Sequence, residues 1–156
     1  MANKNYREFV RDQGGISDFV FRYSIRSHAG GFEGHSAVHF GWEGNNELLV
    51  TSVLSNQTSD LPPKTHSFLS LNPENAVVTA LKVAEEGPEK GLIVRAWETD
   101  GKATQVTFDV SSLEIKSAVK TDLLERDQEN LVLFKGKISV SIPAHGFVTV
   151  RLKSST

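Results

Sequence analysis

Cysteine is absent from the 156 residues, and the chain contains one methionine, two tryptophans and two tyrosines. Without cysteine the chain has no disulfide framework, no thiolate nucleophile and no cysteine-ligated zinc site. A membrane-length apolar run and the apolar core of a signal peptide are also missing, so we expect a cytoplasmic protein with no membrane partner. The 17 basic residues are interspersed with 19 acidic ones. A basic stripe that would follow a phosphate backbone is therefore absent, and no nucleic-acid partner is expected.

What the sequence does contain is a series of short segments rich in Val, Ile, Thr and Phe. Phe19, Phe21, Tyr23 and Ile25 recur at every second position, which predicts a strand with one buried face. The same composition predicts further strands at residues 47–54, 66–71, 76–84, 92–98, 103–110, 113–120, 131–134, 137–142 and 147–152.

Turn residues separate these segments. Asp100-Gly101, Gly87-Pro88 with Lys90-Gly91, and Lys135-Gly136 predict hairpins. Many short strands without a long helical period predict an all-β fold, an antiparallel β-sandwich. Residues 33–42 fit either a short helix or an extended segment. We expect one sandwich domain at residues 12–153, preceded by an N-terminal extension at residues 1–11 and followed by a polar tail at residues 154–156.

Four motifs follow one another along the second half of the chain: the VVTALKVAE segment with Lys82, LIVRAWETDG, TDLLE at residues 121–125, and IPAHGFVTV near the end. In this order they resemble the C-terminal β-domain of family 38 glycoside hydrolases, the α-mannosidases. Upstream, Asp12-Gln13-Gly14 and the His28-Ala29-Gly30 segment are similar to a further stretch of the family. The resemblance implies a sandwich of the galactose-mutarotase-like, supersandwich type.

The resemblance also implies that catalysis and structural support belong to different domains. In this family the reaction is performed by an N-terminal domain, which nothing in this chain resembles. The chain is thus expected to be a non-catalytic domain of an α-mannosidase, inactive alone, whose partner is a catalytic domain that hydrolyses α-mannosides. The divalent metal of the family, zinc or a similar ion, is expected in that catalytic domain, because its His-x-Asp motif is missing here. Because part of the family's sandwich precedes Asp12, an exposed edge near residues 19–26 predicts pairing with a second copy.

Neither catalytic nor metal-binding residues are assigned in this chain. Glu98 and Glu125 lie in the family-like motifs beside apolar residues, and a structural pairing with Lys82, Arg95 or Arg126 is expected rather than acid–base catalysis. His35 and His39 share a face only if residues 33–42 are helical, and surface positions are the preferred interpretation.

Sugar binding is the alternative function that the residues themselves support. An aromatic ring beside polar groups can stack on a pyranose, and two tryptophans have such neighbours. An independent carbohydrate-binding module that uses Trp42 or Trp97 is therefore the second hypothesis. The candidates for carbohydrate binding or a domain interface are His28, Trp42, Asn45, Asn46, Arg95, Trp97 and Glu98.

Overall fold

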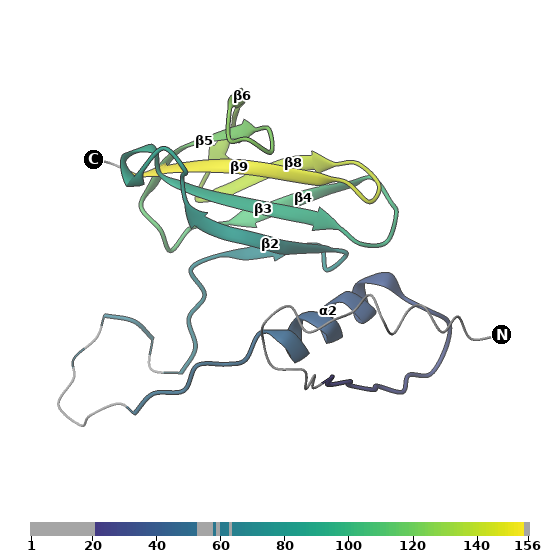
Figure 1. Cartoon of the computed structure of the whole chain (residues 1–156). Helices are drawn as coiled ribbons and strands as arrows, with labels where there is room; N and C mark the ends of the chain where they lie inside the picture. Colours follow the sequence, from purple (N-terminus) through teal and green to yellow (C-terminus); the bar gives the residue numbers. More distant parts are fainter. Residues whose placement is uncertain (1–20, 53–57, 59, 63, 155–156) are drawn as a thin grey trace, which may run out of the picture.

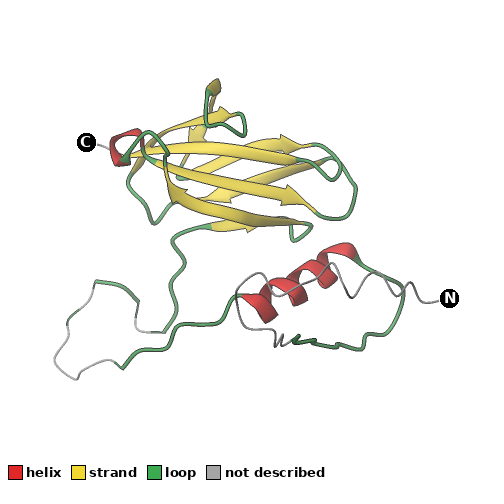
Figure 2. Ribbon diagram, in the orientation of Figure 1, coloured by secondary structure: helices red, strands yellow, loops and turns green. Residues whose placement is uncertain are grey.

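The computed structural model describes residues 21–52, 58, 60–62 and 64–154. Its described part contains one α-helix, one short 3-10 helix and nine strands, arranged as Figures 1 and 2 show. In chain order these elements are α2 (Gly34–Asn45), β1 (Ser70–Asn72), β2 (Ala76–Val83), η1 (Pro88–Lys90), β3 (Leu92–Glu98), β4 (Thr104–Asp109), β5 (Ile115–Thr121), β6 (Asp127–Leu131), β7 (Leu133–Phe134), β8 (Lys137–Ile142) and β9 (Phe147–Ser154).

The strands form two antiparallel sheets that face each other. One sheet has four strands in the order β1-β4-β8-β7, and the other has five in the order β2-β3-β9-β5-β6. The predicted antiparallel β-sandwich is confirmed, while its finer supersandwich type stays a prediction. The predicted hairpins at Gly87-Pro88 with Lys90-Gly91 and at Lys135-Gly136 connect the paired strands β2–β3 and β7–β8. The hairpin predicted at Asp100-Gly101 is wrong, because this turn leads from β3 to β4, which lie in different sheets. The boundaries at residues 12 and 153 stay predictions.

The core lies between the two sheets and follows from the alternation of side chains along each strand. In β8, Ile138, Val140 and Ile142 are buried while the residues between them are exposed. Phe108 of β4 pairs with Ile138 in the register and is fully buried. Burial of each such side chain contributes about 1.5–3 kcal/mol. This shared core fixes the outward direction of the remaining strand positions, which include Arg95 and Trp97 on β3.

Two strand predictions in the first third of the chain are wrong over the described residues. Residues 21–25 and 47–52 form no strand, and Phe21, Tyr23 and Ile25 are largely exposed. Residues 19–20 and 53–54 of these predictions lie outside the described residues. Alternation produces a strand only where another strand pairs beside it, and no described strand lies beside these segments. The self-pairing edge predicted at residues 19–26 is therefore not a strand over residues 21–26.

Two further strand predictions need smaller corrections. The segment at residues 66–71 forms a strand only from Ser70, and the segment at residues 131–134 contributes the end of β6 and the short β7. The strand β6 was missed because its sequence DQENL is polar. It lies at the edge of the five-stranded sheet, where four of its five residues are exposed.

The segment that fitted either a helix or an extended strand is helical. Helix α2 runs beside β2, as Figure 1 shows, and none of its residues is buried. His39 Nε2 lies 3.2 Å from the carbonyl oxygen of Glu74, just before β2. Among the described residues, no helix is long and apolar enough to cross a membrane.

Candidate functional site

The seven residues predicted from the sequence fall into separate parts of the structure. His28 lines a cleft of about 390 Å³ between the extended segment before α2 and the helix itself. Trp42, Asn45 and Asn46 lie at the C-terminal end of α2, and Arg95, Trp97 and Glu98 lie on β3. The structure thus brings the β3 residues together but does not join them to His28 in one site.

Asn45 and Asn46 have a local structural role. The side-chain amide of Asn45 donates to the Gly41 carbonyl at 2.7 Å, and that of Asn46 donates to the Trp42 carbonyl at 2.9 Å. These carbonyls belong to the last turn of α2, where the helix itself supplies no donors. Trp42 is 40% exposed and borders a shallow groove with Val78 and Thr79 of β2. Trp42 therefore faces a groove that it shares with β2, while the two asparagines cap the helix.

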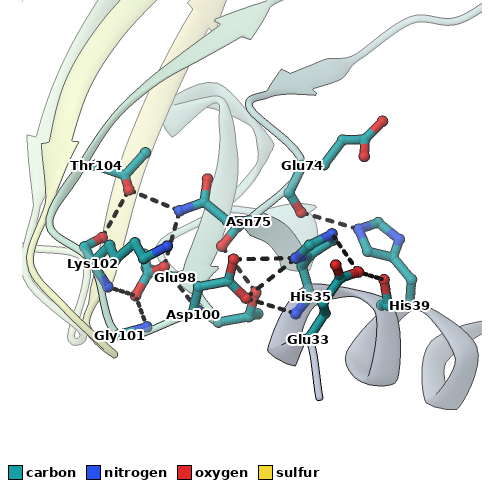
Figure 3. Close-up of polar contacts among 12 residues, drawn as sticks. Glu33, His35, His39, Glu74, Asn75, Glu98, Asp100, Gly101, Lys102 and Thr104 are labelled. Carbon is teal, nitrogen blue, oxygen red and sulfur yellow. Dashed lines mark hydrogen bonds and ion pairs between the residues drawn. The ribbon is translucent and has the colours of Figure 1, made fainter. Parts of the chain in front are cut away.

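Glu98 organises one end of the sandwich (Figure 3). Its carboxylate is fully buried and accepts five hydrogen bonds. Oε1 accepts from the Asp100 amide at 2.8 Å and from Asn75 Nδ2 at 3.0 Å. Oε2 accepts from three further backbone amides, those of Gly101 (2.8 Å), Lys102 (3.1 Å) and His145 (2.9 Å).

These bonds explain the charge state of Glu98. Burial alone raises the pKa of the carboxyl, but the amides of His145, Asp100 and Lys102 together with the side chain of Asn75 outweigh burial and lower its pKa. Glu98 is therefore a buried anion stabilised by neutral donors. The expected pairing of Glu98 with Lys82, Arg95 or Arg126 is wrong, because amides of two turns occupy its oxygens instead. Glu98 ties the β3–β4 turn to the β8–β9 turn.

Helix α2 is attached to the same end of the sandwich, next to Glu98. Asp100 accepts a 2.7 Å hydrogen bond from the His35 amide, and its carboxylate lies 3.1 Å from the His35 ring nitrogen Nδ1 (Figure 3). Gly34 permits this approach, because a β-carbon at that position would lie 2.6 Å from the Thr99 carbonyl oxygen. Among the described residues, no group of three or more His, Cys, Asp or Glu is arranged to hold a metal ion.

On the outer face of the five-stranded sheet, Trp97 stacks on Phe147. The two residues are register partners on β3 and β9, with ring centroids 6.1 Å apart and planes inclined by 19°. Arg95 follows on the same face, where its Nε donates to the Thr149 hydroxyl at 3.1 Å and its Nη2 donates to the Leu123 carbonyl at 3.1 Å. Two of the predicted candidates, Arg95 and Trp97, therefore belong to one surface.

The β5–β6 loop, which contains the TDLLE motif, folds over this outer face. Asp122 accepts from the amides of Leu124 and Arg126, both at 2.9 Å, and so closes the loop. Glu125 adopts a left-handed backbone conformation with φ of 64° and turns its side chain toward β2. There its Oε1 lies 2.7 Å from Lys82 Nζ, and its Oε2 accepts from the Glu85 amide at 2.8 Å. The predicted pairing of Glu125 with Lys82 is confirmed.

Arg151 of β9 lies beneath the same loop and was not singled out from the sequence. Its side chain is 3% exposed, its Nε donates to Asp127 at 2.9 Å, and its Nη2 donates to the Glu125 carbonyl. The available signal was a cation within the apolar run FVTVRL, where an ion partner is required. Hydrogen bonds from Lys82 and Glu85 lower the pKa of Glu125 despite burial, and Glu125 followed by Glu85 raises the pKa of Lys82.

The loop leaves two leucines facing solvent. Leu123 and Leu124 are 61% and 74% exposed, and Phe147 on the same face is 50% exposed. We call Trp97, Phe147, Leu123 and Leu124 the outer apolar surface. Apolar groups gathered in this way on one face are typical of a surface that contacts another protein. The described residues around it offer packing and ion pairs, not the paired carboxylates of a glycosidase centre.

The sandwich is similar to a domain of a known protein family. Residues 75–150 match the model of the glycosyl hydrolases family 38 C-terminal beta sandwich domain. A search of curated proteins found no match to the chain. The matched range runs from the residue before β2 into β9, and it includes Glu98, the TDLLE loop and the outer apolar surface. Residues 75–150, which contain most of the sandwich, are therefore identified as a C-terminal beta sandwich domain of the family 38 glycosyl hydrolases.

Proposed function

We propose that this chain is the non-catalytic C-terminal sandwich of an α-mannosidase, and that it supports a separate catalytic domain which hydrolyses α-mannosides. The observation that carries the proposal is the family match over residues 75–150. The parent enzyme would be cytoplasmic, and its divalent metal, zinc or a similar ion, would be held by the catalytic domain. The role of this chain would be to pack against that domain and stabilise it.

The outer apolar surface is the contact that we assign to the catalytic domain. The network of Lys82, Glu125 and Arg151, in which Glu125 and Arg151 are buried, holds the β5–β6 loop on the sheet. Leu123 and Leu124 are therefore presented in a fixed position, which lowers the entropic cost of association. The stacked pair of Trp97 and Phe147 adds a rigid aromatic area of the kind enriched at the centres of interfaces.

Sugar binding through Trp42 or Trp97 receives less support. Trp97 already stacks on Phe147, and Trp42 borders the groove between α2 and β2. This second hypothesis therefore stays a prediction for these two residues.

An assay of the isolated chain tests the non-catalytic part of the proposal. The purified chain is expected to release no chromophore from a chromogenic α-mannoside, with or without zinc or cobalt. The same chain after repurification and treatment with a chelator provides the control for a contaminating enzyme. Turnover that survives repurification and is abolished by the chelator would contradict the proposal.

A reconstitution experiment tests the supporting role. The catalytic domain of the cognate family 38 enzyme, produced separately, is expected to bind the chain and to gain thermal stability from it. Phe147→Asp and Leu123→Asp are expected to weaken the complex at least tenfold, because each places a charge in an apolar contact. Phe134→Asp on the other sheet is the matched control, since Phe134 is similarly exposed. Equal binding by all three variants would exclude this surface as the interface.

A further inference from the structure

The outer face of the four-stranded sheet carries a groove of about 700 Å³ that has no part in the proposed domain contact. Each of its four strands contributes to the lining. The residues that line it are Ser70, Asn72, Thr107, Asp109, Val132, Phe134, Lys137 and Ser139. We call this surface the hydroxyl groove, because short hydroxyl and amide side chains form most of its floor.

The strand register arranges these side chains in two parallel rows. The first row runs Ser70, Asp109, Lys137 and Phe134 across β1, β4, β8 and β7. The second row runs Asn72, Thr107 and Ser139 across β1, β4 and β8. Since neighbouring strands lie about 4.8 Å apart, the first row spans about 14 Å. This length suits a short chain molecule better than a single small metabolite.

The floor presents groups that both donate and accept hydrogen bonds. The Thr107 and Ser139 hydroxyls lie 3.0 Å apart, and either can act as the donor. Nearby on the same strands, the Ser141 hydroxyl donates to Gln105 at 2.9 Å. Hydroxyl and amide groups of this kind match the alternating donors and acceptors of a polyol.

The two charged groups of the hydroxyl groove neutralise each other. Lys137 Nζ lies 3.4 Å from Asp109 Oδ2. Hydrogen bonds from the Ser111 side chain and amide lower the pKa of Asp109 despite desolvation, with a smaller contribution from Lys137, so the carboxylate is an acceptor at neutral pH. The groove therefore has no net charge that would attract a phosphate-bearing or strongly ionic ligand. A neutral ligand is complementary to it.

An exposed aromatic ring borders the hydroxyl groove. Phe134 is 66% exposed, and its neighbour Val132 is 80% exposed. The Lys135 ammonium lies 5.4 Å from the centroid of the Phe134 ring, so a cation already occupies one region beside the ring. A flat ring beside a hydroxyl-rich floor supplies the two kinds of contact that a pyranose requires, one for its C–H face and one for its hydroxyls.

The opposite sheet shows that this arrangement is not a general property of the sandwich. There, Arg95, Arg151 and Lys82 extend across the outer face and the β5–β6 loop covers it. On the four-stranded sheet the rows across β1, β4 and β8 carry mostly short side chains, and Val132 is the one residue of the described lining that lies outside a strand. The hydroxyl groove is therefore an accessible, uncharged and hydrogen-bonding surface.

From these observations we propose that the hydroxyl groove binds a neutral oligosaccharide, with Phe134 stacking on a sugar ring and Thr107, Ser139, Asn72 and Ser70 bonding its hydroxyls. This site uses neither Trp42 nor Trp97. It is independent of the contact with a catalytic domain, because it lies on the other sheet. The loss of one function would leave the other intact.

A titration followed by nuclear magnetic resonance tests the proposal on the full chain. The probes are α-linked mannotriose, maltotriose, cellotriose and chitotriose, each raised into the millimolar range. At least one probe is expected to shift, in a saturable way, the amides of Ser70, Thr107 and Ser139. Absence of a saturable shift with all four sugars, or shifts centred on Trp42 or Trp97, would overturn it.

Variants then test whether Phe134 and the hydroxyls form the site. Phe134→Ala is expected to weaken binding at least about fivefold, because it removes the stacking surface. Ser139→Ala is expected to weaken it about threefold by removing one hydrogen-bonding group. Phe147→Ala is the matched control on the other sheet and is expected to bind as the parent chain does. Unchanged binding by Phe134→Ala, in a variant that unfolds at the parent's denaturant midpoint, would also overturn the proposal.

Discussion

Glu98 and Glu125 are both buried glutamates of the five-stranded sheet region, but different groups stabilise their charges. Backbone amides and one asparagine surround Glu98, and no described residue with a formal positive charge forms an ion pair with it. Glu125 instead contacts the Lys82 ammonium, while Arg151 binds its backbone carbonyl. The first region uses many short, fixed dipoles at the end of the sandwich. The second uses ion pairs to hold a loop, and ion pairs respond to salt and to partner charges.

This contrast separates the structural role of Glu98 from the interface role that we propose for the β5–β6 loop. The Glu98 cluster joins two turns and lies within the sandwich, where replacement of any donor affects the fold. The Glu125 network joins a loop to the outer face and sets the position of Leu123 and Leu124. We therefore expect substitution of Glu98 to lower the free energy of unfolding. Substitution of Glu125 is expected first to displace the β5–β6 loop.

The largest expected effect comes from Glu98→Gln. The new amide group places N–H donors opposite other donors, because both carboxylate oxygens already accept hydrogen bonds. Leaving buried donors unpaired costs about 1–3 kcal/mol each, so the free energy of unfolding is expected to fall by about 3 kcal/mol. Urea unfolding monitored by circular dichroism measures it. Glu129→Gln on the exposed strand β6 is the control and is expected to change stability by less than about 0.5 kcal/mol.

The next largest loss of folding stability is expected when the pH is lowered. The ordinary pKa of the Glu98 carboxyl is 4.5, and its pKa in the folded chain is lower. The unfolded chain therefore binds more protons between the two values, and the stabilisation is complete above about pH 4.5 and is lost as pH falls through the folded pKa. In urea titrations across this range, stability of the parent is expected to decline more steeply than that of Glu98→Gln. Parallel curves for the two proteins would contradict the role assigned to this carboxylate.

A smaller effect is expected from Glu125→Gln, which weakens the contact with Lys82 but retains an oxygen for the Glu85 amide. The loss of stability is expected to be less than about half that of Glu98→Gln, because one face of this network is open to solvent. Added salt is expected to narrow the difference between Glu125→Gln and the parent while leaving the Glu98→Gln difference unchanged. Urea midpoints at low and high salt provide the measurement. If the stability difference between Glu98→Gln and the parent also changed with salt, the charges of Glu98 and Glu125 would not be stabilised in different ways.

The same contrast explains what the sequence predicted and what it did not. β2, β3, β4, β8 and β9 were predicted closely, because alternation and turn residues are local signals. The pairing of Glu125 with Lys82 was also predicted, since both residues lie in family-like motifs. The hydrogen-bond donors of Glu98 were not predicted, because any residue type supplies a backbone amide and the sequence therefore does not indicate which amides approach Glu98. Arg151 was missed for a related reason: its partners are brought together only by folding.

The first third of the chain shows the limit of local pattern. Residues 21–25 have the alternation of a strand, but the described structure contains no strand beside them. Residues 34–45 contain three glycines and two histidines, which disfavour a helix, and yet α2 forms. Contacts of α2 with Asp100 and Glu74, at the end of the sandwich, supply the stabilisation that the low helix propensity of these residues does not give.

The smallest effect is expected from two glycine substitutions in α2. They test whether the helix forms through its contact with Asp100 or through its own helix propensity. Replacing a helical glycine by alanine favours the helix by about 1 kcal/mol when there is space. Gly41→Ala has that space, because an added β-carbon meets nothing within 4 Å. Gly34→Ala does not, since its β-carbon would lie 2.6 Å from the Thr99 carbonyl oxygen. Both variants are expected to keep the stability of the sandwich, because no residue of α2 is buried.

The two glycine variants are expected to differ at one amide. The His35 amide donates to Asp100 at 2.7 Å, so its hydrogen exchange reports whether α2 is attached to the sandwich. Gly34→Ala is expected to speed exchange of this amide at least about tenfold, whereas Gly41→Ala is expected to leave it unchanged or slower. If both variants protect the His35 amide equally, α2 forms through its own propensity and not through its contact with Asp100. In that case the Glu98 region would not extend beyond the two turns that it joins, and α2 would be independent of it.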